Sequence, residues 1–312
     1  MTTTVPSLSY ENGLIRLVDI EVADPGEGEL QVTAAVCGIC SWDIATCKLG
    51  DDFAFPAPAG HEGVGYVSKI GPGVTGFLEG DRVAFGGFAK LRNTAASRVH
   101  KIPESKILDE HWVVEPVSCV VTGIDHCHIK PGDRLVLIGC GFMGQLFLQG
   151  LQHTSAEQIV ALDVDSTRVD QARALGATEV FDLTEHDSSS LAGELKDRGV
   201  DVVIDTTGSQ QGLDLATDIV RRGGVINLFG WIKGERASFD PSRWHLGGFT
   251  VINSAPASQI RDPFPAAIRL LQKGVFDLSQ LVTHVVPVSD YPALMSKILA
   301  GEKGYLKGVV KL

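Results

Sequence analysis

Three side chains that suit one metal ion lie far apart along the chain: Cys40, His61 and Glu115. A thiolate, an imidazole and a carboxylate are all zinc ligands, and a catalytic zinc keeps three protein ligands and one open position for water or substrate. In such a site the ion acts as a Lewis acid toward an alcohol or a ketone. The wide spacing favours a catalytic site drawn from several loops, because a compact structural site would show paired C-x-x-C motifs.

The third ligand position has a rival candidate in Cys119, which follows Glu115 by one helical turn if that segment is helical. A single C-x-x-C motif ends at Cys40, and without a second pair downstream it does not indicate a zinc knuckle. Two histidines and a cysteine at residues 126–128 precede a surface turn. We therefore expect that cluster to be exposed rather than to bind a metal.

A glycine-rich turn follows a short apolar run at residues 134–138, fits G-x-G-x-x-G and opens a helix. In this context the motif indicates a dinucleotide site, since the glycines permit a tight turn, a close approach to pyrophosphate and close helix–strand packing. The free N–H groups of the helix then face the phosphates. The alternative is a glycine-rich turn without a ligand. The cofactor-binding residues predicted in this turn are Gly139, Gly141, Phe142, Met143 and Gly144.

The preferred cofactor depends on two charged residues beyond this turn. Asp163 ends the next predicted strand, where an acid accepts hydrogen bonds from both ribose hydroxyls. A carboxylate there would also repel the extra phosphate of NADP, so the sequence predicts NAD rather than NADP. Arg168 argues in the opposite direction, because a nearby arginine can bind that phosphate.

The elements that must position these residues fall into two groups. Residues 1–117 contain short β segments bounded by Gly and Pro, and residues 118–254 alternate apolar strands with helices. The alternation predicts an α/β fold with a doubly wound parallel sheet. The tail, residues 255–312, is predicted to contain a helix at 265–273 and to return to the first domain. The predicted strands are 31–36, 65–70, 134–138, 159–163, 179–181, 200–204 and 224–229, and the helices before the tail are 143–152 and 166–175.

Composition narrows the classes of function. The chain has 312 residues, a net charge of −11 and 44% hydrophobic residues. The acidic balance argues against nucleic acid and against an anionic membrane surface as partners, since both require a basic footprint. The N-terminus shows no basic start with an apolar run, and the uncharged stretch at 135–156 contains glycines and glutamines. With six cysteines, these features predict a cytoplasmic protein with reduced thiols.

The same residues carry a family resemblance. The segment from Val36 to Asp43 resembles the first zinc-ligand segment of medium-chain dehydrogenases, and Gly60-His61-Glu62 with the glycines up to Gly80 closely resembles that family's zinc signature. Residues 115–119 resemble its sorbitol-dehydrogenase-like branch, in which a glutamate is the third ligand. The resemblance spans nearly the whole chain. It implies a partly open, GroES-like β-barrel catalytic domain built from both chain ends, and a Rossmann domain.

The resemblance also implies roles for single residues. Cys40 and His61 would bind the catalytic zinc, Glu62 would lie beside it and replace or assist Glu115, and Asp43 would hold a ligand histidine. Thr206 would lie near the cofactor. Lys307 resembles a basic residue that contacts the cofactor pyrophosphate, with a solvated lysine as the alternative. The family further implies a homodimer or homotetramer joined through the Rossmann domains near residues 224–253.

The sequence departs from the family pattern in two places. The four-cysteine structural zinc lobe is missing, so we expect one catalytic zinc and no structural zinc. Trp42 and Ala45 stand where the family usually carries a Ser or Thr and a His in a proton relay. An indole cannot relay a proton as a hydroxyl can. The proton route stays open between Glu62, Glu115 through a water, Lys48 and a substrate hydroxyl. Trp42 could instead form an apolar platform for a sugar ring together with Trp231, and Trp244 is a further candidate for this platform. The alternative is that Trp231 and Trp244 are ordinary packing residues.

These features together predict a zinc-dependent oxidoreductase that transfers a hydride between NAD(H) and a secondary alcohol or ketone. The expected substrate is a small molecule, either a polyol, a sugar or a cyclitol. The sequence leaves two alternative functions open. One is a zinc-free reductase of quinones or enones on the same fold. The other is an NAD(H)-binding redox sensor without turnover, which the missing relay residues favour.

Overall fold

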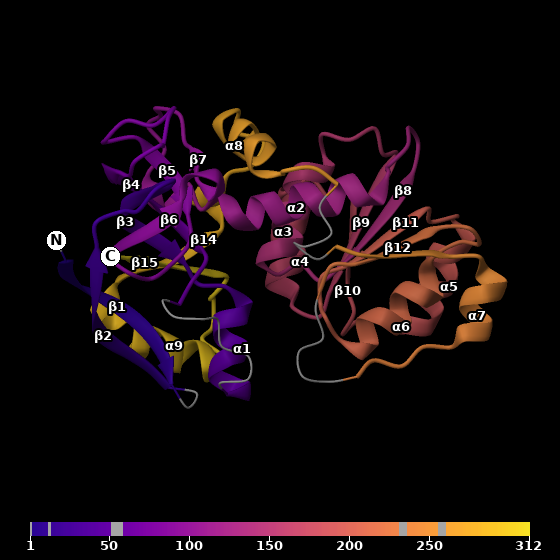
Figure 1. The fold of residues 1–312 in the computed structure, drawn as a ribbon. Coiled ribbons are helices and arrows are strands. Elements are labelled where there is room, and N and C mark those ends of the chain that lie inside the picture. The colour runs from indigo at the N-terminus through magenta and orange to yellow at the C-terminus, as the bar shows by residue number, and fades with distance from the viewer. Residues whose placement is uncertain (1, 12–13, 51–58, 231–235, 255–259) are drawn as a thin grey trace. The chain divides into compact units, whose positions relative to one another are not determined.

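The computed structural model describes residues 2–11, 14–50, 59–230, 236–254 and 260–312 (Figure 1). The chain divides into two units, one made of Met1–Pro116 with Ala267–Leu312 and the other of Val117–Ala266. The first unit is therefore built from both ends of the chain.

The chain returns to the first unit later than the sequence placed it, at Ala267 rather than at residue 255. An ion pair ties the intervening described residues to the second unit, because Arg261 lies 2.8 Å from Asp125. Just before this segment, Ser254 Oγ donates to Oδ1 of Asn227 at 2.7 Å.

A mostly antiparallel sheet forms the centre of the first unit. In the described part of the chain its strands follow the order β14-β15-β3-β4-β5-β7, while β6 pairs with β3 and β1 pairs with β2. The strands are β1 (Thr2–Glu11), β2 (Leu14–Ala23), β3 (Glu29–Gly38), β4 (Glu62–Ile70), β5 (Arg82–Phe85), β6 (Leu91–Ala95), β7 (His100–Lys101), β14 (Val282–Pro287) and β15 (Lys307–Lys311). The helices are α1 (Ser41–Leu49), α9 (Tyr291–Leu299) and most of α8 (Phe264–Gln272), with α2 (Val114–Cys127) leading into the second unit.

Strand β3 contributes to two of the apolar clusters of this unit. Leu30, Val32 and Ala34 pack in one cluster with residues of β4 and β5. Cys37 and Ile39 join the other, which also contains residues from β1, α9 and β15. Each fully buried aliphatic side chain of this kind contributes about 1.5–3 kcal/mol. The segment that leads to Cys40 is therefore anchored in the core.

The second unit contains a parallel sheet with strand order β10-β9-β8-β11-β12-β13 among the described residues. This is the doubly wound order of a dinucleotide-binding fold, and it confirms the predicted fold class. The strands are β8 (Arg134–Ile138), β9 (Gln158–Asp163), β10 (Glu179–Asp182), β11 (Val202–Asp205), β12 (Val225–Leu228) and β13 (Thr250–Asn253). The helices are α3 (Phe142–Leu151), α4 (Ser166–Ala174), α5 (Ser188–Asp197), α6 (Gln210–Ile219) and α7 (Pro241–Gly247).

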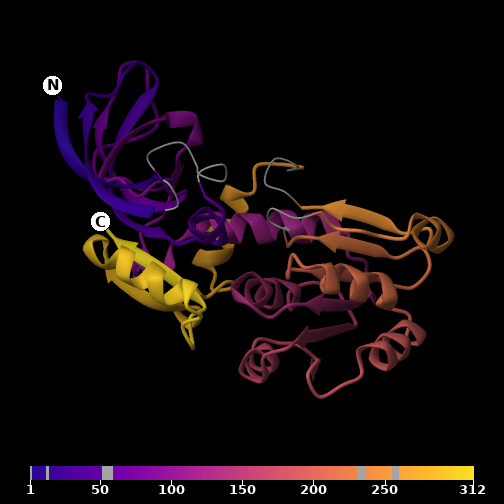
Figure 2. The same ribbon diagram turned by 90° about the horizontal axis from the view of Figure 1, so that it is seen from below.

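Helices cover this sheet on both faces, as Figures 1 and 2 show. Right-handed crossovers place α3 and α4 on one face and α5 and α6 on the other, because the strand order reverses between β8 and β11. The structure confirms the predicted strands and helices, with ends that differ by a few residues at most. The reversal leaves the turns after β8 and β11 side by side, and such a switch point is where ligands bind.

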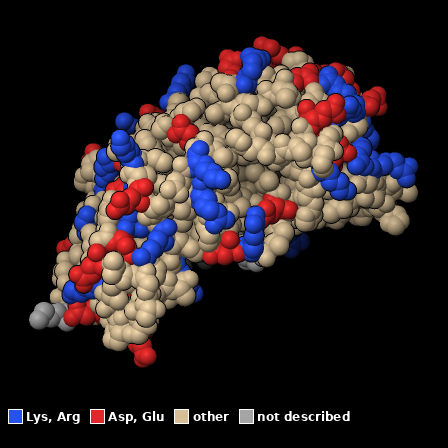
Figure 3. All heavy atoms as spheres, turned by 90° about the horizontal axis from the view of Figure 1, so that it is seen from above, with Lys and Arg blue, Asp and Glu red and all other residues tan. Residues whose placement is uncertain are grey.

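The face drawn in Figure 3 carries acidic and basic side chains close together. None of the helices in the described residues combines the length and the apolar character needed to cross a membrane.

Candidate active site

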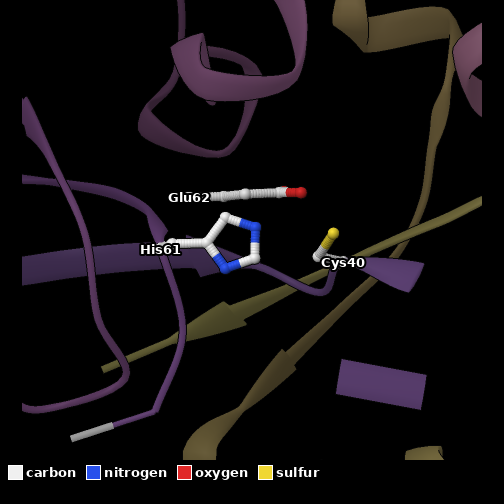
Figure 4. Close-up of side chains that lie close together, drawn as sticks. All are labelled: Cys40, His61 and Glu62. Atoms are coloured by element: carbon white, nitrogen blue, oxygen red, sulfur yellow. The ribbon is translucent and has the colours of Figure 1, made fainter. Parts of the chain in front are cut away.

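Three possible metal ligands converge in the first unit (Figure 4). Cys40 Sγ, a ring nitrogen of His61 and a carboxylate oxygen of Glu62 all lie within 4.8 Å of one another. Cys40 directly precedes α1, and Glu62 opens β4. The antiparallel pairing of β3 with β4 sets Gly38 opposite Glu62, so the loop that carries Cys40 begins beside the histidine and the glutamate.

The donor atoms of this cluster fit zinc. Thiolate sulfur, imidazole nitrogen and carboxylate oxygen are the three ligand types that zinc accepts in catalytic sites. Cys40 and His61 are half-buried and Glu62 is buried, so a bound ion would be partly sheltered from water. We define these three residues as the metal cluster.

Charge and burial determine whether the Cys40 thiol is protonated. Burial raises its pKa, and the negative charges of Glu62 and Asp43 raise it further, while Lys307 opposes them. In the metal-free protein the thiol is therefore protonated. Because a metal binds the thiolate, loading the cluster must release that proton.

Asp43 supports the loop that carries Cys40. Its carboxylate accepts hydrogen bonds from the backbone N–H of Cys40 at 2.7 Å and from the Tyr10 hydroxyl at 2.9 Å. Burial raises the pKa of Asp43 to about 6, against the opposing influence of His61. The carboxylate thus interacts with all three members of the metal cluster, with Cys40 by a hydrogen bond and with His61 and Glu62 electrostatically.

Lys307 forms a buried ion pair with Glu62. Its side chain is 4% exposed, and its Nζ also donates to the carbonyl oxygen of Ile39 at 2.8 Å. Burial alone would lower the pKa of Lys307, but the charge of Glu62 outweighs it and the pKa is raised. Gly38 makes room for this pair, since a Cβ there would lie 2.1 Å from Glu62 Oε2. The alternative of a solvated lysine is therefore wrong.

The other residues predicted around the metal lie outside the metal cluster. Glu115 is half-buried in the first turn of α2, and its charge contributes to raising the pKa of Cys40. Cys119 follows one turn later on the same helix and is half-buried as well. Trp42 is half-buried in the first turn of α1, whereas Trp231 lies outside the described residues.

The expectation that residues 126–128 are exposed is wrong for two of the three. His126 and Cys127 are buried, because α2 extends to Cys127 and packs against the second unit's sheet. His126 Nδ1 lies 3.1 Å from Oγ of Ser254, and Cys127 Sγ lies 3.2 Å from Nδ2 of Asn227. Only His128, after the helix, is exposed.

The glycine-rich turn has the close packing that its motif predicts. Gly139 has a φ of +91°, which favours glycine. A Cβ on Gly144 would lie 2.0 Å from the Gly139 carbonyl oxygen, so helix α3 approaches strand β8 too closely for a side chain. A Cβ on Gly141 would meet only Arg168, at 4.0 Å, which leaves its backbone open to a ligand. Phe142 and Met143 follow, half-buried, in the first turn of α3.

Asp163 and Thr206 border this turn. Asp163 accepts a hydrogen bond from Cys140 N at 2.6 Å and another from Asp165 N at 2.9 Å, and a carboxylate keeps further lone pairs for a ligand. Thr206 Oγ1 donates to the Gly139 carbonyl at 2.8 Å, which ties the turns after β8 and β11 together. Arg168 completes the group near Gly141.

Gly144→Ala is expected to weaken dinucleotide binding by at least about tenfold and to cost about 1–3 kcal/mol of unfolding free energy, because backbone must move to admit the new methyl group. Calorimetric titration with the dinucleotide and denaturant unfolding measure the two effects. The matched control is Gly193→Ala on α5, where a Cβ meets nothing within 4 Å. Unchanged binding in the Gly144 variant would contradict this description of the turn.

Two protein-family models match the chain. The model described as alcohol dehydrogenase GroES-like domain matches residues 26–104, and the one described as zinc-binding dehydrogenase matches residues 143–273. Together they cover about two thirds of the sequence.

Relatives are similar over nearly the full length. D-arabinitol dehydrogenase 1 of Uromyces fabae is 28% identical, over 90% of this chain and 89% of its own. Two solved structures share the fold. One is an Escherichia coli oxidoreductase/dehydrogenase of unknown specificity, with a TM-score of 0.89, 23% identity and 99% of both chains covered. The other is 2R,3R-butanediol dehydrogenase of Bacillus subtilis, with a TM-score of 0.87, 24% identity, and 99% of this chain and all of that chain covered.

Proposed function

Since the chain belongs to the medium-chain dehydrogenase/reductase superfamily, in its sorbitol-dehydrogenase-like branch, and is an alcohol oxidoreductase, we propose that it interconverts a secondary alcohol and its ketone in a polyol, sugar or cyclitol. One catalytic zinc and NAD would serve the reaction. The observation that carries the proposal is the convergence of Cys40, His61 and Glu62 in a chain that also has an open glycine turn. The relatives named for D-arabinitol and butanediol support a substrate that carries more than one hydroxyl.

Each residue of the site has a task in this chemistry. A bound zinc would supply a Lewis acid at the alcohol oxygen, and a bound nicotinamide would supply the hydride acceptor. Cys40 and His61 would hold the ion, and Asp43 keeps the Cys40 loop in place. The glycine turn with Thr206 orients the cofactor, because hydride transfer requires the reacting atoms about 3–3.5 Å apart.

Glu115 is proposed as the third ligand. Glu62 is closer to Cys40 and His61, but Lys307 already pairs with its carboxylate. Glu115 is half-buried and interacts electrostatically with Cys40. If Glu115 is the ligand, Glu115→Gln lowers zinc affinity more than Glu62→Gln does; the reverse order would assign the position to Glu62.

The proton leaves by a route that does not use Trp42 or Ala45, since neither side chain can take up and release a proton at neutral pH. Glu62, Glu115 through a water, Lys48 and a substrate hydroxyl are the candidates, and Glu62 is the one that belongs to the metal cluster. Trp42 forms an apolar part of the substrate site in this proposal, and its half-buried position supports that role.

NAD preference is proposed to depend on Asp163. Asp163→Ser should lower kcat/KM for NAD⁺ by about 10–100-fold, because a hydrogen bond to a charged group contributes about 1.5–3 kcal/mol. The same change removes the charge that repels the phosphate of NADP, so the ratio of NADP⁺ to NAD⁺ efficiency should rise, with Arg168 available to bind that phosphate. Steady-state kinetics with both cofactors measure the ratio. Arg168→Ala in the Asp163→Ser background should reverse the gain, and an unchanged ratio in Asp163→Ser would contradict the assignment.

The proposal includes assembly and location. Among the described residues β13 is an edge strand of the second unit's sheet, and an edge strand offers unpaired backbone groups to a second copy, which supports a homodimer or a homotetramer. All six cysteines lie within the described residues and none of them forms a disulfide there, which supports a reducing, cytoplasmic setting.

A kinetic panel tests the function. Purified protein is assayed with polyols, sugars, cyclitols and simple alcohols, each with NAD⁺ and NADP⁺, before and after chelation and zinc replacement. The proposal expects turnover of a secondary alcohol with NAD⁺ that chelation removes and zinc restores. Turnover of quinones or enones that survives complete metal removal would favour a zinc-free reductase. NADH binding without any turnover would favour a redox sensor.

A further inference from the structure

Two tyrosines extend the contacts of the metal cluster into the core. Asp43 Oδ2 accepts the backbone N–H of Cys40 at 2.7 Å, and Asp43 Oδ1 accepts the Tyr10 hydroxyl at 2.9 Å. The Tyr10 hydroxyl lies 2.8 Å from the Tyr291 hydroxyl. A hydrogen-bonded chain therefore connects Tyr291 to the loop that carries Cys40.

The number of hydroxyl protons determines which group donates and which accepts in each hydrogen bond of this series. Tyr10 has one hydroxyl proton and donates it to Asp43, so Tyr291 must donate to the oxygen of Tyr10. Burial and the charge of Asp43 raise the pKa of both tyrosines, which keeps both protons in place. Donors aligned in this way polarise one another and strengthen the bond to the final acceptor, Asp43.

Both tyrosines are held by packing. Tyr291 is fully buried at the start of α9, and its ring centroid lies 5.2 Å from that of Phe88. Tyr10 lies near the end of β1 and packs against the same apolar cluster as Tyr291. The N-terminal strand and a helix near the C-terminus thus both direct a hydroxyl toward one buried carboxylate.

We propose that Tyr10 and Tyr291 are positioning residues of the zinc site, whose hydrogen bonds hold Asp43, and through it the Cys40 loop, in the geometry that binds the metal. The inference rests on the proposed function, because it takes Cys40 to be a zinc ligand. Removing a partner that orients a metal ligand typically lowers metal affinity by about 10–100-fold. We expect an effect of that size for Tyr10, which touches Asp43, and a smaller one for Tyr291, which acts through Tyr10.

The alternative is that the two phenols only fill the core. Phenylalanine keeps the ring and its packing and removes only the hydroxyl, so Tyr10→Phe and Tyr291→Phe separate the two roles. Tyr66→Phe is the matched control, because the Tyr66 hydroxyl also donates to a carboxylate, that of Asp109 at 3.1 Å, but lies outside the metal cluster.

The test measures metal binding rather than turnover. Full-length protein is stripped of metal, the dissociation constant for Zn²⁺ is measured by competition with a chromophoric chelator, and the absorption spectrum is recorded with Co²⁺ in place of Zn²⁺. Tyr10→Phe should weaken zinc binding by about 10–100-fold and shift the cobalt bands. Tyr66→Phe should change neither. The double variant should bind no more weakly than Tyr10→Phe alone, since Tyr291 acts through Tyr10.

Native affinity and an unchanged cobalt spectrum in Tyr10→Phe would overturn the inference, as would an equal loss of affinity in Tyr66→Phe. If Tyr10→Phe does not fold, Tyr291→Phe decides: weaker zinc binding with a shifted spectrum supports the inference, and native values overturn it. An unaltered protein that binds neither Zn²⁺ nor Co²⁺ would overturn the proposed function and this inference together. Zinc binding that is insensitive to the tyrosines overturns the inference alone.

Discussion

His61→Ala should bind no zinc at the catalytic site and should lose activity by about 10³-fold or more. The imidazole is one of the proposed protein ligands, and a Lewis-acid metal contributes several kcal/mol to the transition state, at about 1.4 kcal/mol per tenfold in rate. Metal analysis of the purified variant and its kcat/KM on the best alcohol substrate measure both losses.

His153→Ala is the control for this prediction. His153 is an exposed histidine of the second unit, so its loss should leave zinc content and turnover at native values. Turnover retained by His61→Ala, with or without zinc, would contradict the role of His61 as a zinc ligand that the reaction requires.

Lys307→Met should destabilise the metal-free protein by about 3–5 kcal/mol, because it leaves the carboxylate of Glu62 buried without its cation. Denaturant unfolding of the metal-free protein measures the loss. The same variant combined with Glu62→Gln should lose less than the sum of the two single changes, since the double change removes both charges.

The exposed Lys297 of α9 provides the control, and Lys297→Met should change the unfolding free energy only slightly. Zinc should recover part of the stability of Lys307→Met, because a cation in the metal cluster compensates for the charge of Glu62. A Lys307→Met protein as stable as the native one would show that the ion pair is not formed in solution.

Local sequence was enough to predict most of the second unit. The alternation of apolar runs with helical segments, and the glycines after residue 138, led to the doubly wound sheet and to the turn that joins β8 to α3. Local sequence predicts these features because each strand is a short apolar run, and because Gly139 and Gly144 stand where a side chain would not fit. The buried positions of His126 and Cys127 were missed because they depend on how α2 packs against β12.

The site in the first unit depends on contacts between distant segments, and the sequence revealed only part of it. Cys40 and His61 carry a recognisable motif. Lys307 resembles a cofactor-contacting residue of the family, but no sequence pattern pairs it with Glu62, because lysine is usually solvated and only the structure brings the two together. Tyr10 and Tyr291 lie 281 residues apart, and neither has a local pattern that points to Asp43. Gly38 was a possible signal for the position of Glu62, because a residue without a side chain leaves room for a carboxylate from a neighbouring strand.

X-ray absorption at the zinc edge shows directly whether Cys40 binds a zinc ion in this protein. We expect one zinc per chain, with a single sulfur at about 2.3 Å and nitrogen or oxygen ligands at about 2.0–2.2 Å, and loss of the sulfur signal in Cys40→Ser. An active protein without zinc, a zinc coordinated by four sulfurs, or a sulfur signal that survives Cys40→Ser would contradict this expectation.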